Sequence, residues 1–173
     1  INGGAFTDEV NTQEWTANGG TPSGVIITDG KVIYDDLNGS STGMVAITKS
    51  GRLIVGNYSV DELFEKNVTE AVIYQTQVLI NNGKMTSIKG DGGEGSAPRT
   101  LIGQNKDGNI ILAVLDAKHE GSRTAATIKE AQEVMYKLGC VTAGTLDGGK
   151  SATMYYNEEV VNKPSYAYGE RSI

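Results

Sequence analysis

The segment from Gly144 to Ser151 (GTLDGGKS) matches the phosphate-binding loop pattern G-x-x-x-x-G-K-[ST] at every specified position. In nucleotide hydrolases this loop leaves a buried strand and opens a helix, whose N-terminal N–H groups bind phosphate. Residues 152–162 are instead rich in Tyr, Val and Thr around Asn157-Glu158-Glu159, a pattern that predicts strand, turn and strand. We therefore interpret the match as accidental and look for other chemistry in the same loop.

Asp147 and the two glycines that follow it, Gly148 and Gly149, are the strongest candidates for chemistry in this loop. A carboxylate beside two residues without Cβ suits a place where the backbone approaches a ligand closely. A tight turn in which Asp147 bonds only to its own backbone is the alternative explanation.

A second polar group, Asp116, Lys118, His119 and Glu120, follows a predicted strand at 109–115. Sites are often assembled at strand ends, and His119 lies beside carboxylates with the side chain best suited to proton transfer near neutral pH. An exposed connection to the next helix is the alternative.

The single histidine and the single cysteine restrict the chemistry further. His119 has no second imidazole to work with, and Cys140 excludes an internal disulfide and a zinc site built on several thiolates. The apolar neighbours of Cys140 predict a buried structural thiol.

The elements that position these residues are predicted to be mostly hairpins. Apolar, β-branched runs are interrupted by turn pairs at Asp29-Gly30, Ser50-Gly51, Asn82-Gly83 and Asp107-Gly108. Capping boxes at Ser59–Glu62 and Thr127–Glu130 begin a short helix and a longer amphipathic one, which Gly139 ends. The fold class predicted is α+β: a mixed, mostly antiparallel sheet built from hairpins, with one main amphipathic helix and one short helix packed on it.

Composition limits the partners. The chain has 173 residues, of which 38% are hydrophobic, so we expect one domain over 1–173, cut from a longer protein because the sequence starts and stops abruptly. The net charge is −6 without a Lys/Arg stripe, which disfavours nucleic acid, and no apolar run approaches the ~20 residues of a membrane span. The Gly-rich linker 88–98 is either inert or a mobile lid beside a site.

Several blocks together resemble the phosphodiester glycosidase family. The opening INGGAF is similar to the family's I-N-G-G-Y-F, and LDGGKSATM is similar to its L-D-G-G-G-S-S-T-M. Further matching blocks occur in the family's order at 22–32, 98–103, 115–118 and 127–132, and at the closing Pro164-Ser165 and Glu170-Arg171. The departures are Ala117-Lys118 for Gly-Arg and Lys150 for Gly, and Lys150 alone creates the likeness to a nucleotide-binding loop.

The resemblance implies hydrolysis of a sugar-1-phosphodiester at the glycosidic carbon. Because phosphate leaves readily, holding it electrostatically and placing a carboxylate near the anomeric carbon matter more than strong acid catalysis. The implied carboxylate is Asp147 first and Asp116 second, with Glu120 or His119 as acid/base partner. The implied substrate-binding residues are Arg99 and Arg171 for phosphate, and Asn2, Thr100, Gly148, Gly149 and Ser151.

No cofactor is expected, and a divalent cation has no motif in this sequence. The expected substrate is a carbohydrate phosphodiester such as a wall polymer or capsule, which implies an extracellular or cell-surface location in a bacterial or phage protein. The rival hypothesis is a non-catalytic glycan or phosphoglycan-binding module of a surface or phage-tail protein. A purely structural module is the third.

Overall fold

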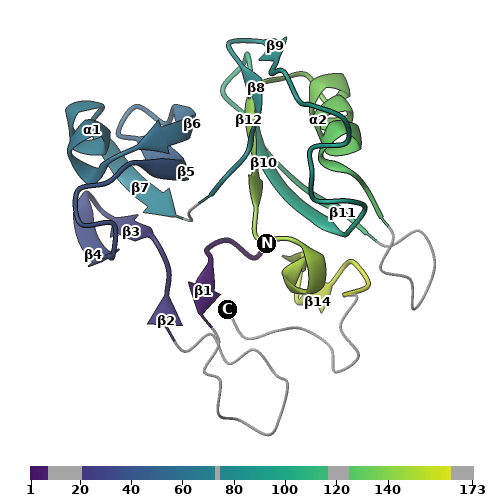
Figure 1. Ribbon diagram of the computed structural model, residues 1–173, viewed down its shortest axis with the longest axis horizontal. Helices are drawn as coiled ribbons and strands as arrows, with labels where there is room; N and C mark the ends of the chain where they lie inside the picture. Colours follow the sequence, from purple (N-terminus) through teal and green to yellow (C-terminus); the bar gives the residue numbers. More distant parts are fainter. Residues whose placement is uncertain (8–20, 73–74, 117–124, 165–173) are drawn as a thin grey trace, which may run out of the picture.

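The computed structural model describes residues 1–7, 21–72, 75–116 and 125–164. Ten strands form two five-stranded sheets, which stand side by side and diverge in Figure 1. The N-terminal sheet has the order β4-β3-β7-β5-β6, from β3 (Val25–Thr28), β4 (Lys31–Asp35), β5 (Thr42–Thr48), β6 (Leu53–Tyr58) and β7 (Val68–Val72). The C-terminal sheet has the order β11-β10-β12-β8-β9, from β8 (Val78–Asn81), β9 (Lys84–Met85), β10 (Arg99–Asn105), β11 (Ile110–Leu115) and β12 (Cys140–Leu146).

The four predicted hairpins are confirmed at their predicted turns. Asp29 and Gly30 both have positive φ, 52° and 70°, as the favoured two-residue hairpin turn requires. The predicted class, antiparallel strands with one main and one short helix, is confirmed. The hairpins are divided between two sheets rather than joined in one, and every described strand pair is antiparallel rather than mixed.

Both helices begin at the predicted capping boxes and cover one sheet each. In α1 (Val60–Glu65) the Ser59 hydroxyl accepts from the Glu62 N–H, and in α2 (Ile128–Lys137) Thr127 does the same for Glu130. Gly139, with a φ of 80°, follows α2 and allows the chain to turn into β12.

Alternating side chains divide the core into three layers. Along β5, Met44 and Ala46 pack with Leu63 of α1, whereas Val45 packs with Ile102 and Leu146 of the C-terminal sheet. On the far side of the C-terminal sheet, α2 covers a third cluster made of Leu79, Ile80, Leu101, Ile128, Ala131, Met135, Cys140 and Ala143. The order of layers is therefore α1, N-terminal sheet, C-terminal sheet and α2 (Figure 1).

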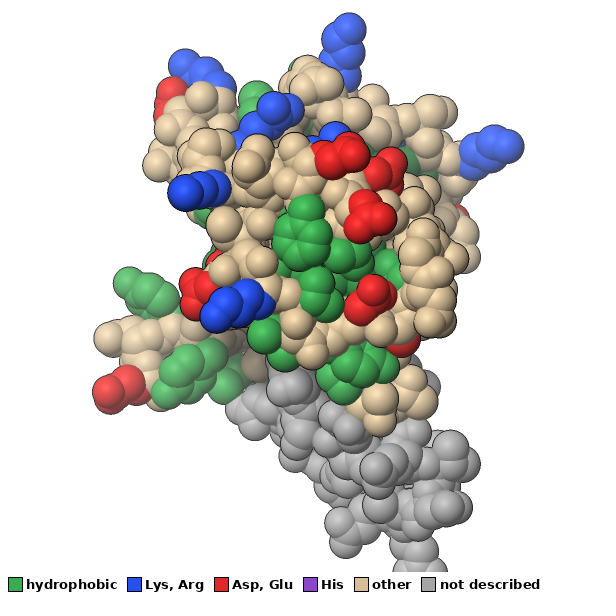
Figure 2. Space-filling model, turned by 90° about the vertical axis from the view of Figure 1, so that its left-hand side faces the viewer, with side chains coloured by type: hydrophobic (Ala, Val, Ile, Leu, Met, Phe, Trp, Pro, Cys, Tyr) green, Lys and Arg blue, Asp and Glu red, His purple; other side chains and the backbone are tan. Residues whose placement is uncertain are grey.

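Two short strand pairs complete the described chain: β1 (Phe6–Thr7) with β2 (Thr21–Pro22), and β13 (Tyr155–Tyr156) with β14 (Glu159–Val160). The second pair confirms the strand, turn and strand predicted after the glycine loop. On the side of the molecule shown in Figure 2, Lys and Arg side chains lie singly among acidic and uncharged ones. Neither helix of the described chain has the length and apolar character to cross a membrane.

Candidate active site

Several of the residues singled out from the sequence meet at one edge of the C-terminal sheet. Strand β10 is antiparallel to both of its neighbours, with Arg99 opposite Leu115 of β11 and Thr100 opposite Leu146 of β12. The first residues of β10 therefore lie beside the last residues of β11 and β12. This register brings Arg99 and Thr100 to the edge where Asp116 and Asp147 follow their strands.

Asn2 ties this edge together from the other end of the chain. It is 2% exposed, and its Nδ2 donates to the backbone carbonyl of Asp147 at 2.5 Å. Its Oδ1 accepts from the Thr100 hydroxyl and from the Thr153 N–H, each at 3.0 Å. Because these partners lie on three different segments, Asn2 is a positioning residue for the backbone of Asp147.

The loop after β12 is fixed by the backbone around Pro98. The N–H of Asp147 donates to the Gly3 carbonyl at 3.2 Å, and the N–H of Gly149 donates to the Pro98 carbonyl at 2.8 Å. A Cβ on Gly148 would lie 2.9 Å from that same carbonyl oxygen, so glycine is needed there for close backbone packing.

The loop does not have the architecture of a nucleotide-binding site. Gly144 to Leu146 lie inside β12, and only a single 3₁₀ turn (η1, Gly149–Ser151) follows. This confirms that the match to the phosphate-binding loop is accidental, because no α-helix begins at this loop.

Arg99 is almost fully buried and holds the linker 88–98. Its Nε donates to the Ala126 carbonyl at 3.1 Å and its Nη2 to the Gly95 carbonyl at 2.7 Å. Its Nη1 binds the Glu94 carboxylate at 2.5 Å. For Arg99 to bind phosphate as predicted, its guanidinium must therefore donate hydrogen bonds to the phosphate as well as to these protein acceptors.

Glu94 and Gln77 belong to this cluster and were not singled out from the sequence. The Gln77 amide Nε2 donates to the second carboxylate oxygen of Glu94. Gln77 is itself fixed to β12, since its N–H donates to the Thr145 hydroxyl at 3.0 Å and its carbonyl accepts from the Thr145 N–H at 3.1 Å. The only sequence signal was a single glutamate within the glycine-rich linker.

Strand alternation predicts that the two candidate aspartates lie toward opposite faces of the sheet. Leu101, Ala143 and Leu115 pack toward α2, so Arg99 lies on the α2 face. Continuing the alternation one residue past β12 and β11 predicts Asp147 on that face and Asp116 on the other. The Asp116 Oδ2 accepts from the Lys163 N–H at 2.5 Å, and its buried Oδ1 has no partner within the described chain.

Some of the remaining predicted site residues lie in the described part of the structure and others do not. His119, Glu120 and Arg171 lie outside the described residues, as do Ala117 and Lys118. Ser151, two residues after Gly149, is buried. Cys140 is buried, as predicted, and burial raises the pKa of its thiol. Among the described side chains, no group of three His, Cys, Asp or Glu could hold a metal ion.

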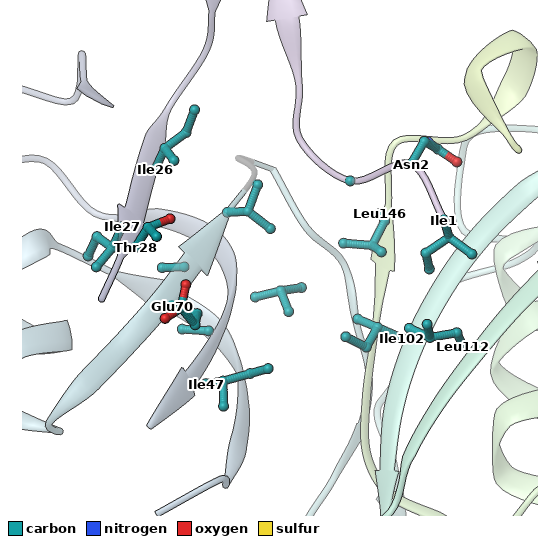
Figure 3. A pocket seen from close by; sticks show the side chains of 15 residues that line it. Ile1, Asn2, Ile26, Ile27, Thr28, Ile47, Glu70, Ile102, Leu112 and Leu146 are labelled. Carbon is teal, nitrogen blue, oxygen red and sulfur yellow. The ribbon is translucent and has the colours of Figure 1, made fainter. Parts of the chain in front are cut away.

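Two hollows lie near this edge. A cleft of about 300 Å³ separates the sheets, where Ile47 faces Ile102 and Leu146 across a mostly aliphatic lining (Figure 3). A second hollow of about 450 Å³ lies next to the linker and is more polar, lined by Gln77, Val78, Thr86, Ser87, Ile88, Lys89, Gly92 and Gly93. Its volume is in the ~300–1,000 Å³ range of small-molecule sites.

The chain is similar to known proteins both in its sequence and in its structure. A family model described as phosphodiester glycosidase matches residues 1–173. The human N-acetylglucosamine-1-phosphodiester alpha-N-acetylglucosaminidase is 26% identical over 157 residues, covering 79% of this chain and 30% of the human protein.

Two solved structures share the fold. The zebrafish N-acetylglucosamine-1-phosphodiester alpha-N-acetylglucosaminidase catalytic domain, auto-inhibited by its pro-peptide, superimposes with a TM-score of 0.70 at 22% identity, covering 95% of this chain and 55% of that one. A hypothetical protein from Synechocystis gives 0.67 at 15% identity, covering 95% and 48%. This chain thus spans about half or less of each of these relatives.

Proposed function

Because the chain belongs to the phosphodiester glycosidase family, we propose that it hydrolyses a sugar-1-phosphodiester at the glycosidic bond, releasing free sugar and a phosphomonoester. The observation that carries the proposal is the meeting of Asn2, Arg99 and Asp147 at one edge of the C-terminal sheet. These residues belong to three separate blocks of the family pattern. The register of β10 and β12 brings Arg99 beside Asp147, and the hydrogen bonds of Asn2 bring it to the same edge.

In this proposal Asp147 supplies the carboxylate that faces the anomeric carbon. Its backbone is held on both sides, by the Gly3 carbonyl and by the Asn2 amide, which fixes where the side chain starts. A carboxylate held in this way stabilises the positive charge that develops on the sugar ring in an oxocarbenium-like transition state. Asp116 is the second candidate for this role.

The phosphate is proposed to lie beside the loop after β12. Arg99 and Arg171 are its proposed cationic partners, and Gly148 and Ser151 its proposed hydrogen-bond donors. The N–H of Gly149 already serves the Pro98 carbonyl, so Gly149 contributes here through its positive φ of 61° rather than through a free donor. The reaction uses no cofactor in this proposal.

We propose N-acetylglucosamine as the first sugar to test, because the human and zebrafish relatives carry it in their names. The phosphate-linked partner is proposed to be an extracellular glycan or glycopolymer. The alternative function is non-catalytic binding of a phosphoglycan, and the same experiment tests it.

The test is an assay of the purified chain on an N-acetylglucosamine-1-phosphodiester, following free sugar and phosphomonoester. Asp147→Asn keeps the size of the side chain, and we expect it to lower kcat by about 100-fold or more with KM within a few-fold. Asp107→Asn, in the exposed β10–β11 turn, makes the same chemical change away from the site and should leave kcat unchanged. If both the wild type and Asp147→Asn bind the substrate without releasing sugar, the chain is a binding module and not an enzyme.

A further inference from the structure

Glu94 is a half-exposed carboxylate whose two oxygens are both held. Arg99 Nη1 lies 2.5 Å from Oε2, and the Gln77 amide donates to Oε1. The Arg99 side chain is 7% exposed, whereas the Glu94 side chain is 47% exposed. Arg99 is therefore inside the protein, whereas Gln77 is partly buried and the Glu94 side chain is about half exposed.

The position of Glu94 follows from the strand order. Strands β8 and β10 lie on either side of β12, each about 4.8 Å from it. Gln77 precedes β8 and Arg99 begins β10, so a carboxylate that contacts both must lie over the end of β12. Asp147 follows that end, and strand alternation predicts its side chain on the α2 face, where Arg99 also lies. Glu94 and Asp147 therefore lie on the same face at the same edge.

The linker 88–98 is attached to the rest of the fold by bonds that do not involve the Glu94 side chain. Arg99 already binds the carbonyls of Gly95 and Ala126, and the linker residue Ala97 pairs with Ala126 through two backbone bonds of 3.1 Å. These bonds fix the linker without any contribution from a carboxylate. A polar hollow with room for a ligand is lined by Gln77, which binds the Glu94 carboxylate, and by Gly93, the residue before Glu94.

We propose that Glu94 is the second carboxylate of the active site and accepts the proton of the attacking water, with Asp147 stabilising the sugar cation. The inference rests on the glycosidase function proposed above. It assigns Arg99 and Gln77 as positioning residues that orient Glu94, a role that replaces the phosphate contact proposed for Arg99 above.

The step balances without a further reactant. The water oxygen forms a bond to the anomeric carbon as the bond from that carbon to the phosphate oxygen breaks, and the bonding electron pair leaves with the phosphomonoester. One water proton moves to Glu94, which later returns it to solvent, and the second stays on the new sugar hydroxyl. A phosphate leaving group needs little protonation, so an acceptor is the more useful second carboxylate.

The main test compares Glu94→Gln and Glu94→Ala with wild type. We expect kcat to fall by about 100-fold or more in both, with KM within about threefold, as for loss of a general base. Sodium azide should restore turnover in Glu94→Ala by attacking the anomeric carbon directly, giving a glycosyl azide that NMR identifies. A residue with only a structural role would show no such rescue.

Matched controls separate local from general effects. Glu65→Gln, on the exposed face of α1, makes the same charge change in the other sheet and should leave kcat unchanged. Arg99→Lys should lower kcat, because it removes the group that orients Glu94. The melting temperature of each variant shows whether the variant is still folded. A kcat for Glu94→Gln within threefold of wild type, or a loss explained by unfolding and without azide rescue, would overturn the proposal.

If the proposed hydrolysis does not occur, the experiments give a result that differs from a failure of the Glu94 proposal alone. If wild type releases no sugar from any phosphodiester, the test becomes calorimetric binding of N-acetylglucosamine 1-phosphate to wild type and Glu94→Gln. A changed Kd keeps Glu94 in a ligand site and rejects only hydrolysis. An unchanged Kd rejects the site at Glu94 as well.

Discussion

Replacing Asn2 by alanine tests whether one buried amide holds the active-site edge together. The change removes the donor to the Asp147 carbonyl and the acceptor for the Thr100 hydroxyl and the Thr153 N–H. A buried polar group left without a partner costs about 1–3 kcal/mol, so three groups at the lower value give about 3 kcal/mol. At about 2–4 °C per kcal/mol for a chain of this size, the melting temperature should fall by about 6–12 °C.

The assay is thermal and urea unfolding followed by circular dichroism. Asn81→Ala, an exposed asparagine at the end of β8, is the matched control and should change stability by less than about 0.5 kcal/mol. Thr100→Val removes the hydroxyl that Asn2→Ala leaves unpaired, so the double variant should be about 1 kcal/mol more stable than the sum of the single effects predicts. A fall of less than 2 °C for Asn2→Ala, or strict additivity with Thr100→Val, would refute the reasoning.

Three further predictions concern the helices and the core. Gly103→Ala places a Cβ 2.5 Å from the Cys140 Sγ and 2.8 Å from the Met135 Cε, so we expect a loss of about 1–3 kcal/mol in urea unfolding; an unchanged midpoint would contradict this close packing. Burial and the raised pKa of the Cys140 thiol predict no reaction with Ellman's reagent at pH 8 until the chain is unfolded, and rapid labelling of the native protein would contradict it. The hydrogen bond from the Ser59 backbone lowers the pKa of Glu62 from its ordinary value, so the ionised cap stabilises the fold above that ordinary pKa and the contribution is lost as the pH falls through the lowered pKa of the folded state. The melting-temperature difference between wild type and Glu62→Gln should therefore shrink in acid, and a constant difference would count against this role.

Local structure was predictable because its causes are local. A turn pair such as Asp29-Gly30 allows the positive φ of a tight hairpin, and the Thr127–Glu130 capping box satisfies the first N–H groups of α2 within four residues. The division of the hairpins into two sheets was not predictable from such signals. It depends on contacts such as Val45 with Ile102, between strands that no turn connects.

The candidate site shows the same limit. Asp147 and its glycines were recognisable because the family pattern places them in one short block. Glu94 was not recognisable, because the evidence for its role is its contacts with Gln77, just before β8, and with Arg99, at the start of β10, and these strands lie on either side of β12. Arg99 was predicted as a phosphate partner from the family resemblance and the chemistry of its guanidinium, and sequence could not reveal that backbone carbonyls and Glu94 accept hydrogen bonds from it.

The bonds of Asn2 also bear on the order in which the protein matures. Each sheet is built from a contiguous part of the chain, residues 25–72 for one and 78–146 for the other, so each can form from neighbouring hairpins. The bond from the Thr153 N–H to Asn2 joins residues 151 positions apart. During synthesis the hairpins can fold as they emerge from the ribosome, but the edge that carries Asp147 cannot close until Thr153 has emerged. We therefore expect a nascent chain to gain its secondary structure well before it gains any activity.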